Sequence, residues 1–150
     1  MVDSPFSFDK AEDSSGFLLW QVTTLWQRGI KKALEKHKLT HAQYVLLASL
    51  MWLSKQKGNV TQIDLSNHSK VDPMTTSTVL RTLQTKGFVK RQEHASDTRA
   101  KVVMLTSNGI GTVKQAIGTV EQFDKDFFSL LGSKQSDFNK QLLKIIHGLH

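Results

Sequence analysis

The stretch DPMTTSTVLRTLQTKGFVKRQEHASDTRAKVVMLT, residues 72–106, decides the fold. Its first half carries the signals of a capped helix. Asp72 is placed to accept hydrogen bonds from the first free N–H groups, and Pro73 takes the first helical position, where a missing N–H is harmless. Gly87 fits the left-handed position that commonly follows the end of a helix. We therefore predict one helix that starts at Pro73 and ends just before Gly87.

The second half of the stretch predicts a β-hairpin. The run GFVKRQEH precedes a polar tip that carries Arg99, and the apolar run from Val102 to Leu105 follows that tip. Two short runs of strand-forming residues on either side of a polar segment are typical of a hairpin. A cation at such a tip suits a nucleic-acid partner, because the negative potential of a narrow minor groove attracts Arg.

The residues in front of the stretch complete a winged helix-turn-helix. VTQIDLSNHSKV contains the cap-like pair Thr61 and Asp64, which predicts a short helix, and KVD is a tight turn. Farther upstream, Thr40 and Gln43 form a capping box at the start of another helix, LTHAQYVLLASLMWLSKQKG. A short helix, a turn, a second helix and a hairpin are the parts of this DNA-binding motif.

Apolar helices flank the motif on both sides. GFLLWQVTTLWQRGIKKALEKHK has apolar residues at helical spacing, in a stripe so wide that we expect it to contact more than one surface. Behind the hairpin, Thr106 and Ser107 cap a long amphipathic helix, Gly132 ends it, and one more amphipathic helix follows. We therefore predict a mainly α fold with a small β-hairpin wing (α+β), in one domain.

Composition limits the partners. The chain has 150 residues, a formal charge of +7 and a pI near 9.7, which favours an anionic partner such as nucleic acid or an anionic membrane. It has no cysteine, which excludes disulfides, thiolate nucleophiles and cysteine-ligated metal sites. The polar N-terminal stretch is unlike a signal peptide, and the longest apolar run, YVLLASLMWL, is too short to span a bilayer. We expect a cytoplasmic protein that does not insert into a membrane.

Enzymatic and metal chemistry have little support. We find no glycine-rich phosphate loop, nucleophile elbow or zinc-protease motif, so we expect neither an enzyme nor a cofactor. His37 and His41 flank one predicted interhelical turn, but no carboxylate or third histidine stands at a metal-ligand spacing. We expect no metal ion, and we interpret these two histidines as solvated or bonded to a helix cap.

A DNA-binding interpretation assigns contacts to the second helix and the hairpin. Short hydroxyl side chains, which donate and accept hydrogen bonds, would face base edges. They are Thr75, Thr76, Ser77 and Thr78. Cations nearby would hold phosphates. They are Arg81, Lys90, Arg91 and Lys101. Arg99 would enter the minor groove, and Asp97 would either close the turn or orient a cation. Taken singly, the hydroxyls also fit a solvated face, and each cation also fits a solubility charge.

These residues make the sequence resemble the MarR family of bacterial transcription regulators. The resemblance covers about residues 16–147 and includes the opening LTHAQYVLL. The helix exit matches the pattern Leu, then Lys-Gly-aromatic-Val, then Arg, in Leu83, Lys86, Gly87, Phe88, Val89 and Arg91. The wing matches Asp-x-Arg followed by Val-x-Leu-Thr, in Asp97, Arg99, Val103, Leu105 and Thr106. The family often has Arg where Thr78 stands, and here Arg81 comes one turn later.

The resemblance implies a homodimer that binds double-stranded DNA. About residues 15–38 and 108–149 would form its dimerisation part, and about residues 40–106 the winged-helix part. It also implies a repressor on a pseudo-palindromic operator, released by a small and often aromatic ligand. Trp20, Tyr44 and Trp52 would line the ligand pocket, while core or interface packing is the other explanation of these rings. The alternative function is a winged-helix module for protein interaction or for non-specific nucleic-acid binding.

Overall fold

The computed structural model describes residues 3–93, 96 and 100–149, in which α-helices surround a small antiparallel sheet. The helices are α1 (Ser15–Leu34), α2 (His41–Ser54), α3 (Gln62–Ser69), α4 (Pro73–Thr85), α5 (Ser107–Phe128) and α6 (Gln135–His147). The strands are β1 (Val60–Thr61), β2 (Val89–Glu93) and β3 (Lys101–Leu105). Short 3-10 turns are η1 (Ala11–Asp13), η2 (Glu35–His37) and η3 (Ser129–Lys134). The predicted fold class, mainly α with a small hairpin wing, is confirmed.

Helix α4 has both of the ends that the sequence predicts. Asp72 accepts a hydrogen bond from the Thr75 N–H at 2.8 Å, with Pro73 in the first helical position. At the other end Gly87 has a φ of 81°, in the left-handed region. The Phe88 N–H then turns back to donate to the carbonyl of Leu83 at 3.0 Å, which closes the helix with a Schellman motif.

The two neighbouring helices start with reciprocal caps. Thr40 and Gln43 form the predicted capping box of α2, and Thr61 and Asp64 form that of α3. Lys57 adds an ion pair to Asp64 at 2.7 Å. Burial alone would raise the pKa of Asp64, but hydrogen bonds from Lys57 and Thr61 outweigh it and lower that pKa. The carboxylate therefore stays charged and holds the start of α3.

The sheet has one strand more than the sequence predicts. Its order is β1-β3-β2, and both neighbouring pairs are antiparallel. In the hairpin Val89 lies opposite Leu105, and on the other side of β3 Val60 lies opposite Val103. Strand β1 has two residues, so it lacks the alternation over several residues by which a strand is recognised in a sequence.

The hydrophobic core is formed mainly by α2, α3, α4 and the sheet, and α1 and α5 add a few side chains to it. Its largest fully buried side chains are Ile30, Leu34, Leu46, Leu47, Leu50, Leu65, Leu80, Leu83, Val60, Val89, Val103 and Val113. Among the described residues of α6 none is buried, and in α1 only Ile30 and Leu34 are. The core therefore belongs mainly to the winged-helix region and to the parts of α1 and α5 that lie against it.

Two glycines let helices come close to their neighbours. A Cβ at Gly109, in the first turn of α5, would collide with the carbonyl of Phe88. A Cβ at Gly29, in α1, would collide with the ring of Phe123 in α5. Helix α5 therefore starts directly against the exit of α4, and one of its rings lies on the backbone of α1.

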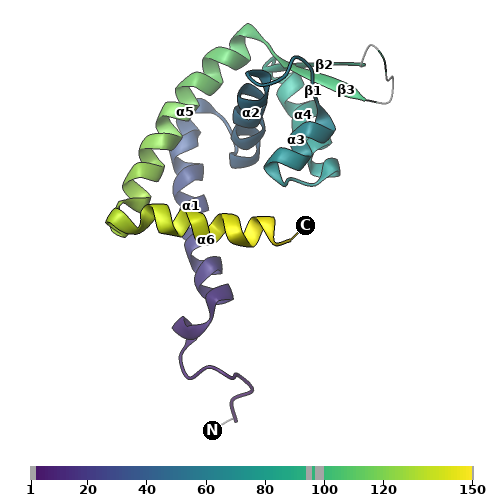
Figure 1. Ribbon diagram of the computed structural model, residues 1–150. Helices are drawn as coiled ribbons and strands as arrows, with labels where there is room; N and C mark the ends of the chain where they lie inside the picture. The colour runs from purple at the N-terminus through teal and green to yellow at the C-terminus, as the bar shows by residue number, and fades with distance from the viewer. Residues whose placement is uncertain (1–2, 94–95, 97–99, 150) are drawn as a thin grey trace.

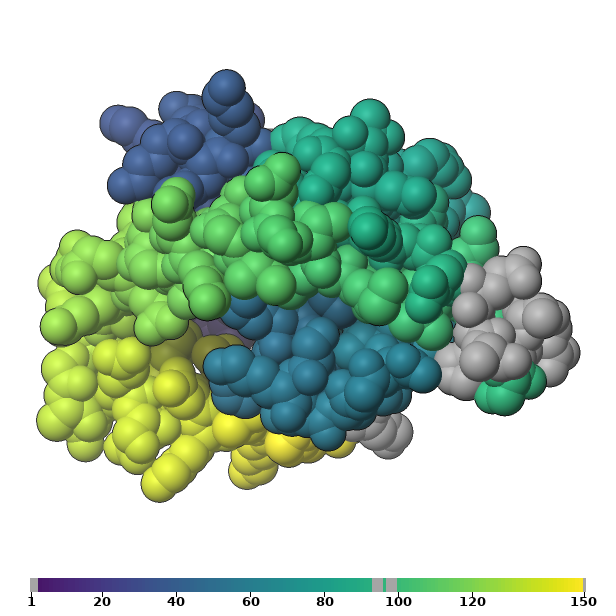
Figure 2. All heavy atoms as spheres, turned by 90° about the horizontal axis from the view of Figure 1, so that it is seen from above, coloured from purple at the N-terminus to yellow at the C-terminus, as the bar shows by residue number. Residues whose placement is uncertain are grey.

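Helix α5 leads from the sheet to the far end of the molecule (Figure 1). There Gly132, with a φ of 54°, turns the chain into α6. Seen from above, α6 lies at the lower left of the molecule and the hairpin lies at the right (Figure 2). Among the described residues, no helix has both the length and the apolar character that crossing a membrane requires.

Candidate nucleic-acid interface

One of the four predicted hydroxyl contacts is buried in the core. Thr76 has no exposed surface, and its hydroxyl donates to the carbonyl of Val71 at 3.3 Å. It stands four positions before the buried Leu80, so both residues lie on the same face of α4. The prediction that Thr76 faces DNA bases is therefore wrong. Thr75 and Thr78 are exposed, and Ser77 is half-buried.

The exposed threonines of the first turns of α4 use their hydroxyl hydrogens within the helix. Thr75 Oγ1 donates to Asp72 Oδ2 at 2.6 Å, and Thr78 Oγ1 donates to the carbonyl of Met74 at 3.1 Å. The bonds from the Thr75 hydroxyl and N–H lower the pKa of Asp72, so the cap stays charged. In this conformation each hydroxyl can accept a hydrogen bond and present its methyl group, while its hydrogen is already engaged.

Two exposed residues near this turn are not among the contacts that the sequence predicts. Met74 is the second residue of α4, and its side chain is 80 % exposed. Lys70 lies exposed in the turn between α3 and α4, in the left-handed region with a φ of 65°. Met74 was recognisable in principle, because it falls off the stripe formed by Thr76, Leu80 and Leu83.

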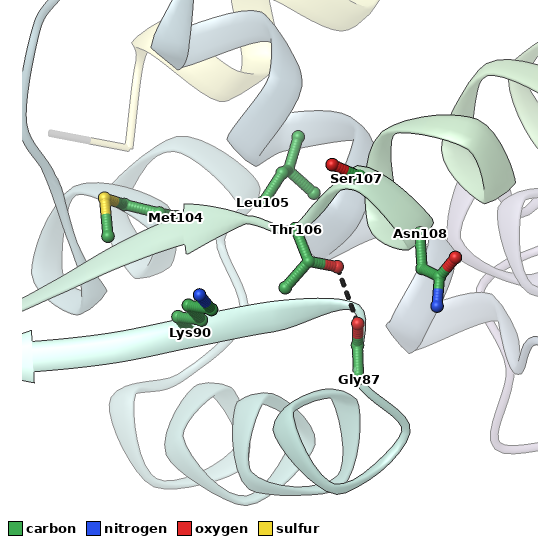
Figure 3. Close-up of a pocket in the computed structure, with 7 residues that line it drawn as sticks. All are labelled: Gly87, Lys90, Met104, Leu105, Thr106, Ser107 and Asn108. Carbon is green, nitrogen blue, oxygen red and sulfur yellow. Dashed lines mark hydrogen bonds between the residues drawn. The ribbon is translucent and has the colours of Figure 1, made fainter.

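The hairpin carries exposed cations on both of its faces. Lys90 lies opposite Met104 across the strands, so these two side chains share one face. They line an open hollow at the start of α5, where Figure 3 shows them on adjacent strands beside Thr106. Lys101 is exposed, and by the alternation of β3 it lies on the opposite face from Met104. The predicted contacts Asp97 and Arg99 lie outside the described residues.

Arg91 connects the hairpin to both helices of the motif. It lies in the middle of β2 and is half-buried. Its Nε donates to Gln84 Oε1 at 2.8 Å, and its Nη1 donates to Gln62 Oε1 at 3.0 Å. Gln84 belongs to α4 and Gln62 begins α3, so one guanidinium fixes the wing against both. This positioning role was not predicted, and a phosphate contact by Arg91 stays a prediction.

Neighbouring elements hold the end of α4. Lys86 Nζ donates to the carbonyl of Lys38 at 2.6 Å and to Gln43 Oε1 at 3.2 Å. Thr106 Oγ1 donates to the carbonyl of Gly87 at 2.6 Å, the bond drawn in Figure 3. The start of α2 and the start of α5 are thus both bonded to the same end of α4. Exposed Arg81 lies between this fixed end and the exposed first turn.

The junction of α1, α2 and α5 contains a half-buried polar cluster. Trp26 Nε1 donates to Asp124 Oδ1 at 2.8 Å, and the ring of His41 meets that of Trp26 edge-on, with 5.0 Å between centroids. Burial lowers the pKa of His41, and the negative charge of Asp124 opposes this effect. Burial, followed by the charges of Asp124 and Glu121, raises the pKa of Tyr44 to about 12. Of the two alternatives that the sequence left for His41, solvated or bonded to a helix cap, the fully solvated one is therefore wrong.

The rings predicted to line a ligand pocket are not enclosed by one chain. The side chain of Trp20 is 69 % exposed on α1, and that of Trp52 is 58 % exposed on α2. Tyr44 is half-buried beside the polar cluster. A pocket built from these three residues would need a further surface to close it.

The chain resembles known regulators of transcription. Residues 35–122 match the family described as "ArnR1-like, winged-helix domain". The chain is 39% identical over 139 residues to the "Uncharacterized HTH-type transcriptional regulator YdcH" of Bacillus subtilis (strain 168), covering 91% of this chain and 95% of that protein. It is 29% identical over 131 residues to the "HTH-type transcriptional repressor Rv2887" of Mycobacterium tuberculosis, covering 87% and 91%.

A solved structure shares the fold over most of the chain. It is the crystal structure of a mutant MarR from E. coli complexed with operator DNA, and its TM-score is 0.76. The sequence identity is 24%, and the match covers 87% of this chain and 91% of that one.

Proposed function

This chain belongs to the MarR family of winged helix-turn-helix transcription regulators, and on that premise we propose that it is a homodimeric repressor of a pseudo-palindromic operator. It is a DNA-binding transcriptional regulator and not an enzyme. The observation that carries the finer proposal is the contrast within α4, whose first turn is exposed and whose end is fixed. A helix anchored in this way can enter a major groove with its first residues foremost.

The proposed dimer follows from apolar side chains that one chain leaves uncovered. On α1 they are Phe17, Leu18, Leu19, Trp20 and Leu25, and on α6 and just after it they are Leu143, Ile145 and Leu149. Exposed apolar surface of this extent on a soluble protein marks a contact surface. A second copy of the chain has the same apolar surface, and in a dimer with twofold symmetry each chain covers that of the other. We therefore assign about residues 15–38 and 108–149 to dimerisation and about residues 40–106 to DNA binding.

In the proposed complex each α4 lies in a major groove, and the two helices are about 34–36 Å apart. Thr75, Ser77 and Thr78 contact base edges. Lys90, Arg91 and Lys101 contact phosphates, as does Arg81. Repression is proposed because the related Rv2887 protein is named a repressor, and a dimer on an operator blocks access of other proteins to that DNA.

Arg99 is proposed to enter the minor groove on the outer flank of each half-site. The proposal comes from its place between β2 and β3 in the sequence, with Asp97 two positions before it. Replacing Arg99 by Ala should weaken operator binding by roughly 1–3 kcal/mol per half-site, and Lys should restore only part of the loss. Affinity at fixed salt measures this, with circular dichroism as the folding control. If Arg99→Ala binds the operator with unchanged affinity and with the same preference for the flanking bases, Arg99 does not contact the DNA.

A small aromatic effector is proposed to bind where Trp20, Tyr44 and Trp52 are completed by the second chain. Such a ligand releases DNA only if it binds more tightly to a dimer whose α4 helices are wrongly spaced. Titrating aromatic acids against a labelled operator, while following Trp fluorescence, tests this. Release of DNA without any change at these rings would place the effector site elsewhere.

The proposed function is tested by selecting bound sites from random DNA and footprinting the protein on the selected sites. A sequence-specific repressor yields one inverted-repeat motif and retains it when salt and competitor DNA rise. The alternative, a winged-helix module without sequence preference, yields no motif and loses all binding together as salt rises. Light scattering of the same sample checks the dimer.

A further inference from the structure

We propose that Met74 recognises the 5-methyl group of thymine, so that this regulator selects its site partly by apolar contact in the major groove. The inference rests on the proposed function, because it requires α4 to enter that groove. It adds a specificity-determining residue and names the chemical feature of DNA that this residue reads.

The first observation is the position of Met74 on α4. Met74, Thr78 and Arg81 follow one another at spacings of four and three residues, which places them on one face of the helix. All three are exposed, and the opposite face holds the buried Leu80 and Leu83. The outward stripe of α4 is therefore apolar at its first turn and cationic two turns later. With α4 in a major groove, Arg81 would lie near the phosphates and Met74 would lie nearest the base edges.

The second observation is the chemistry of the residues around Met74. Thr76 is buried, and the hydroxyl hydrogens of Thr75 and Thr78 are already donated within the chain. The hydroxyls of Thr75 and Thr78 therefore offer acceptors and methyl groups rather than free hydrogens. Of the four bases only thymine presents a methyl group to the major groove, on its C5 atom. Methionine is unbranched and polarizable, so it can adapt to that methyl group.

The third observation is that Met74 is held in place although its side chain is free. Asp72 caps the helix, Pro73 fixes the first helical position, and the Met74 carbonyl accepts the hydrogen bond from Thr78. A single exposed apolar side chain is ordinary on a protein surface. An exposed one in the capped first turn of this helix is not, because in the proposed complex this turn meets the bases first.

The test replaces thymine by uracil in the site selected from random DNA. Uracil lacks only the methyl group, so hydrogen bonding of the base pair is unchanged. At the thymine that Met74 meets, uracil should weaken binding of the natural protein about fourfold, the effect of one buried methyl group. Met74→Ala should weaken binding to the thymine site and should lose no further affinity with uracil. Met74→Leu should retain part of the discrimination.

Lys101→Ala is the matched control, because a phosphate contact should weaken the thymine and uracil sites by the same factor. Melting temperatures should be equal for Met74→Ala and the natural protein, since the side chain is exposed. If no thymine in the site shows a methyl effect, or if Met74→Ala keeps the full uracil penalty, the inference is overturned while the proposed function stands. If no site is selected from random DNA, the proposed function fails first.

Discussion

The winged-helix region buries its apolar residues, whereas the terminal helices leave many of theirs exposed. In the first, leucines and valines such as Leu80, Leu83 and Val103 have no exposed surface or almost none. In the second, Leu19, Ile145 and Leu149 remain more than half exposed. One region thus completes its core within a single chain, and the other leaves its apolar surface for a contact still to be made. Substitutions in the two regions should therefore change different quantities.

The largest effect is expected in the winged-helix core. Leu83→Ala should lower the free energy of unfolding by about 2–5 kcal/mol, because it removes buried methyl groups and leaves a cavity. Urea unfolding followed by circular dichroism measures it. Leu130→Ala is the control, because Leu130 is 95 % exposed and should change little within the monomer. Equal losses at both positions would contradict the division into two regions.

The next effect concerns the joint where the two regions meet. Gly109→Ala should destabilise the fold by roughly 1–3 kcal/mol, because the added Cβ overlaps the Phe88 carbonyl and pushes α5 away from α4. Gly111→Ala, in the same helix with open space around it, should be neutral or slightly stabilising. If both variants melt alike, α5 does not depend on this close approach.

A smaller effect on free energy is expected at the uncovered patch. Ile145→Asp should weaken the dimer by roughly 1–2 kcal/mol per chain, because it puts a charge into the proposed contact. The monomer should keep its helical content, since α6 buries none of its described residues in the monomer. Sedimentation at several concentrations measures the change, with Asn139→Asp as the charge control. A variant that unfolds instead of dissociating would show that α6 belongs to the core.

The smallest effect is a pH dependence at the junction of α1, α2 and α5. The folded protein has a lowered pKa for His41, so it takes up this proton less readily than the unfolded chain does. The stabilising contribution is present above pH 6.5, the ordinary value, and is lost as the pH falls through the lower folded pKa. Melting temperatures between about pH 7.5 and 5 should therefore fall less for His41→Gln than for the natural protein. If the melting temperatures of both proteins fall equally with pH, the protonation of His41 does not affect stability.

Local signals in the sequence predict the helix starts and the fold class well. Asp72 with Pro73, Gly87, and the pair Thr40 and Gln43 act within a few residues of each other, so their spacing alone indicates what they do. The order of elements around them then predicts the winged helix-turn-helix.

The interface was harder to predict because its residues depend on distant partners. Arg91 meets Gln62 only after the wing folds back on α3, and no spacing in the sequence indicates that bond. Thr76 was misassigned because its hydroxyl suggested DNA, although its spacing to Leu80 and Leu83 places it on the buried face. The sequence does not mark Met74 as an interface residue, because an apolar residue in a helix usually belongs to the core.

Strand β1 also has a consequence for the order of folding. Its pairing of Val60 with Val103 closes a loop that contains α3, α4 and β2, so it joins residues far apart along the chain. Contacts between distant residues form late, because the entropy of closing the loop is lost before they stabilise anything. We expect the helices to assemble first and the sheet to close last. Val60→Ala should then speed unfolding more than it slows refolding, which stopped-flow fluorescence can measure.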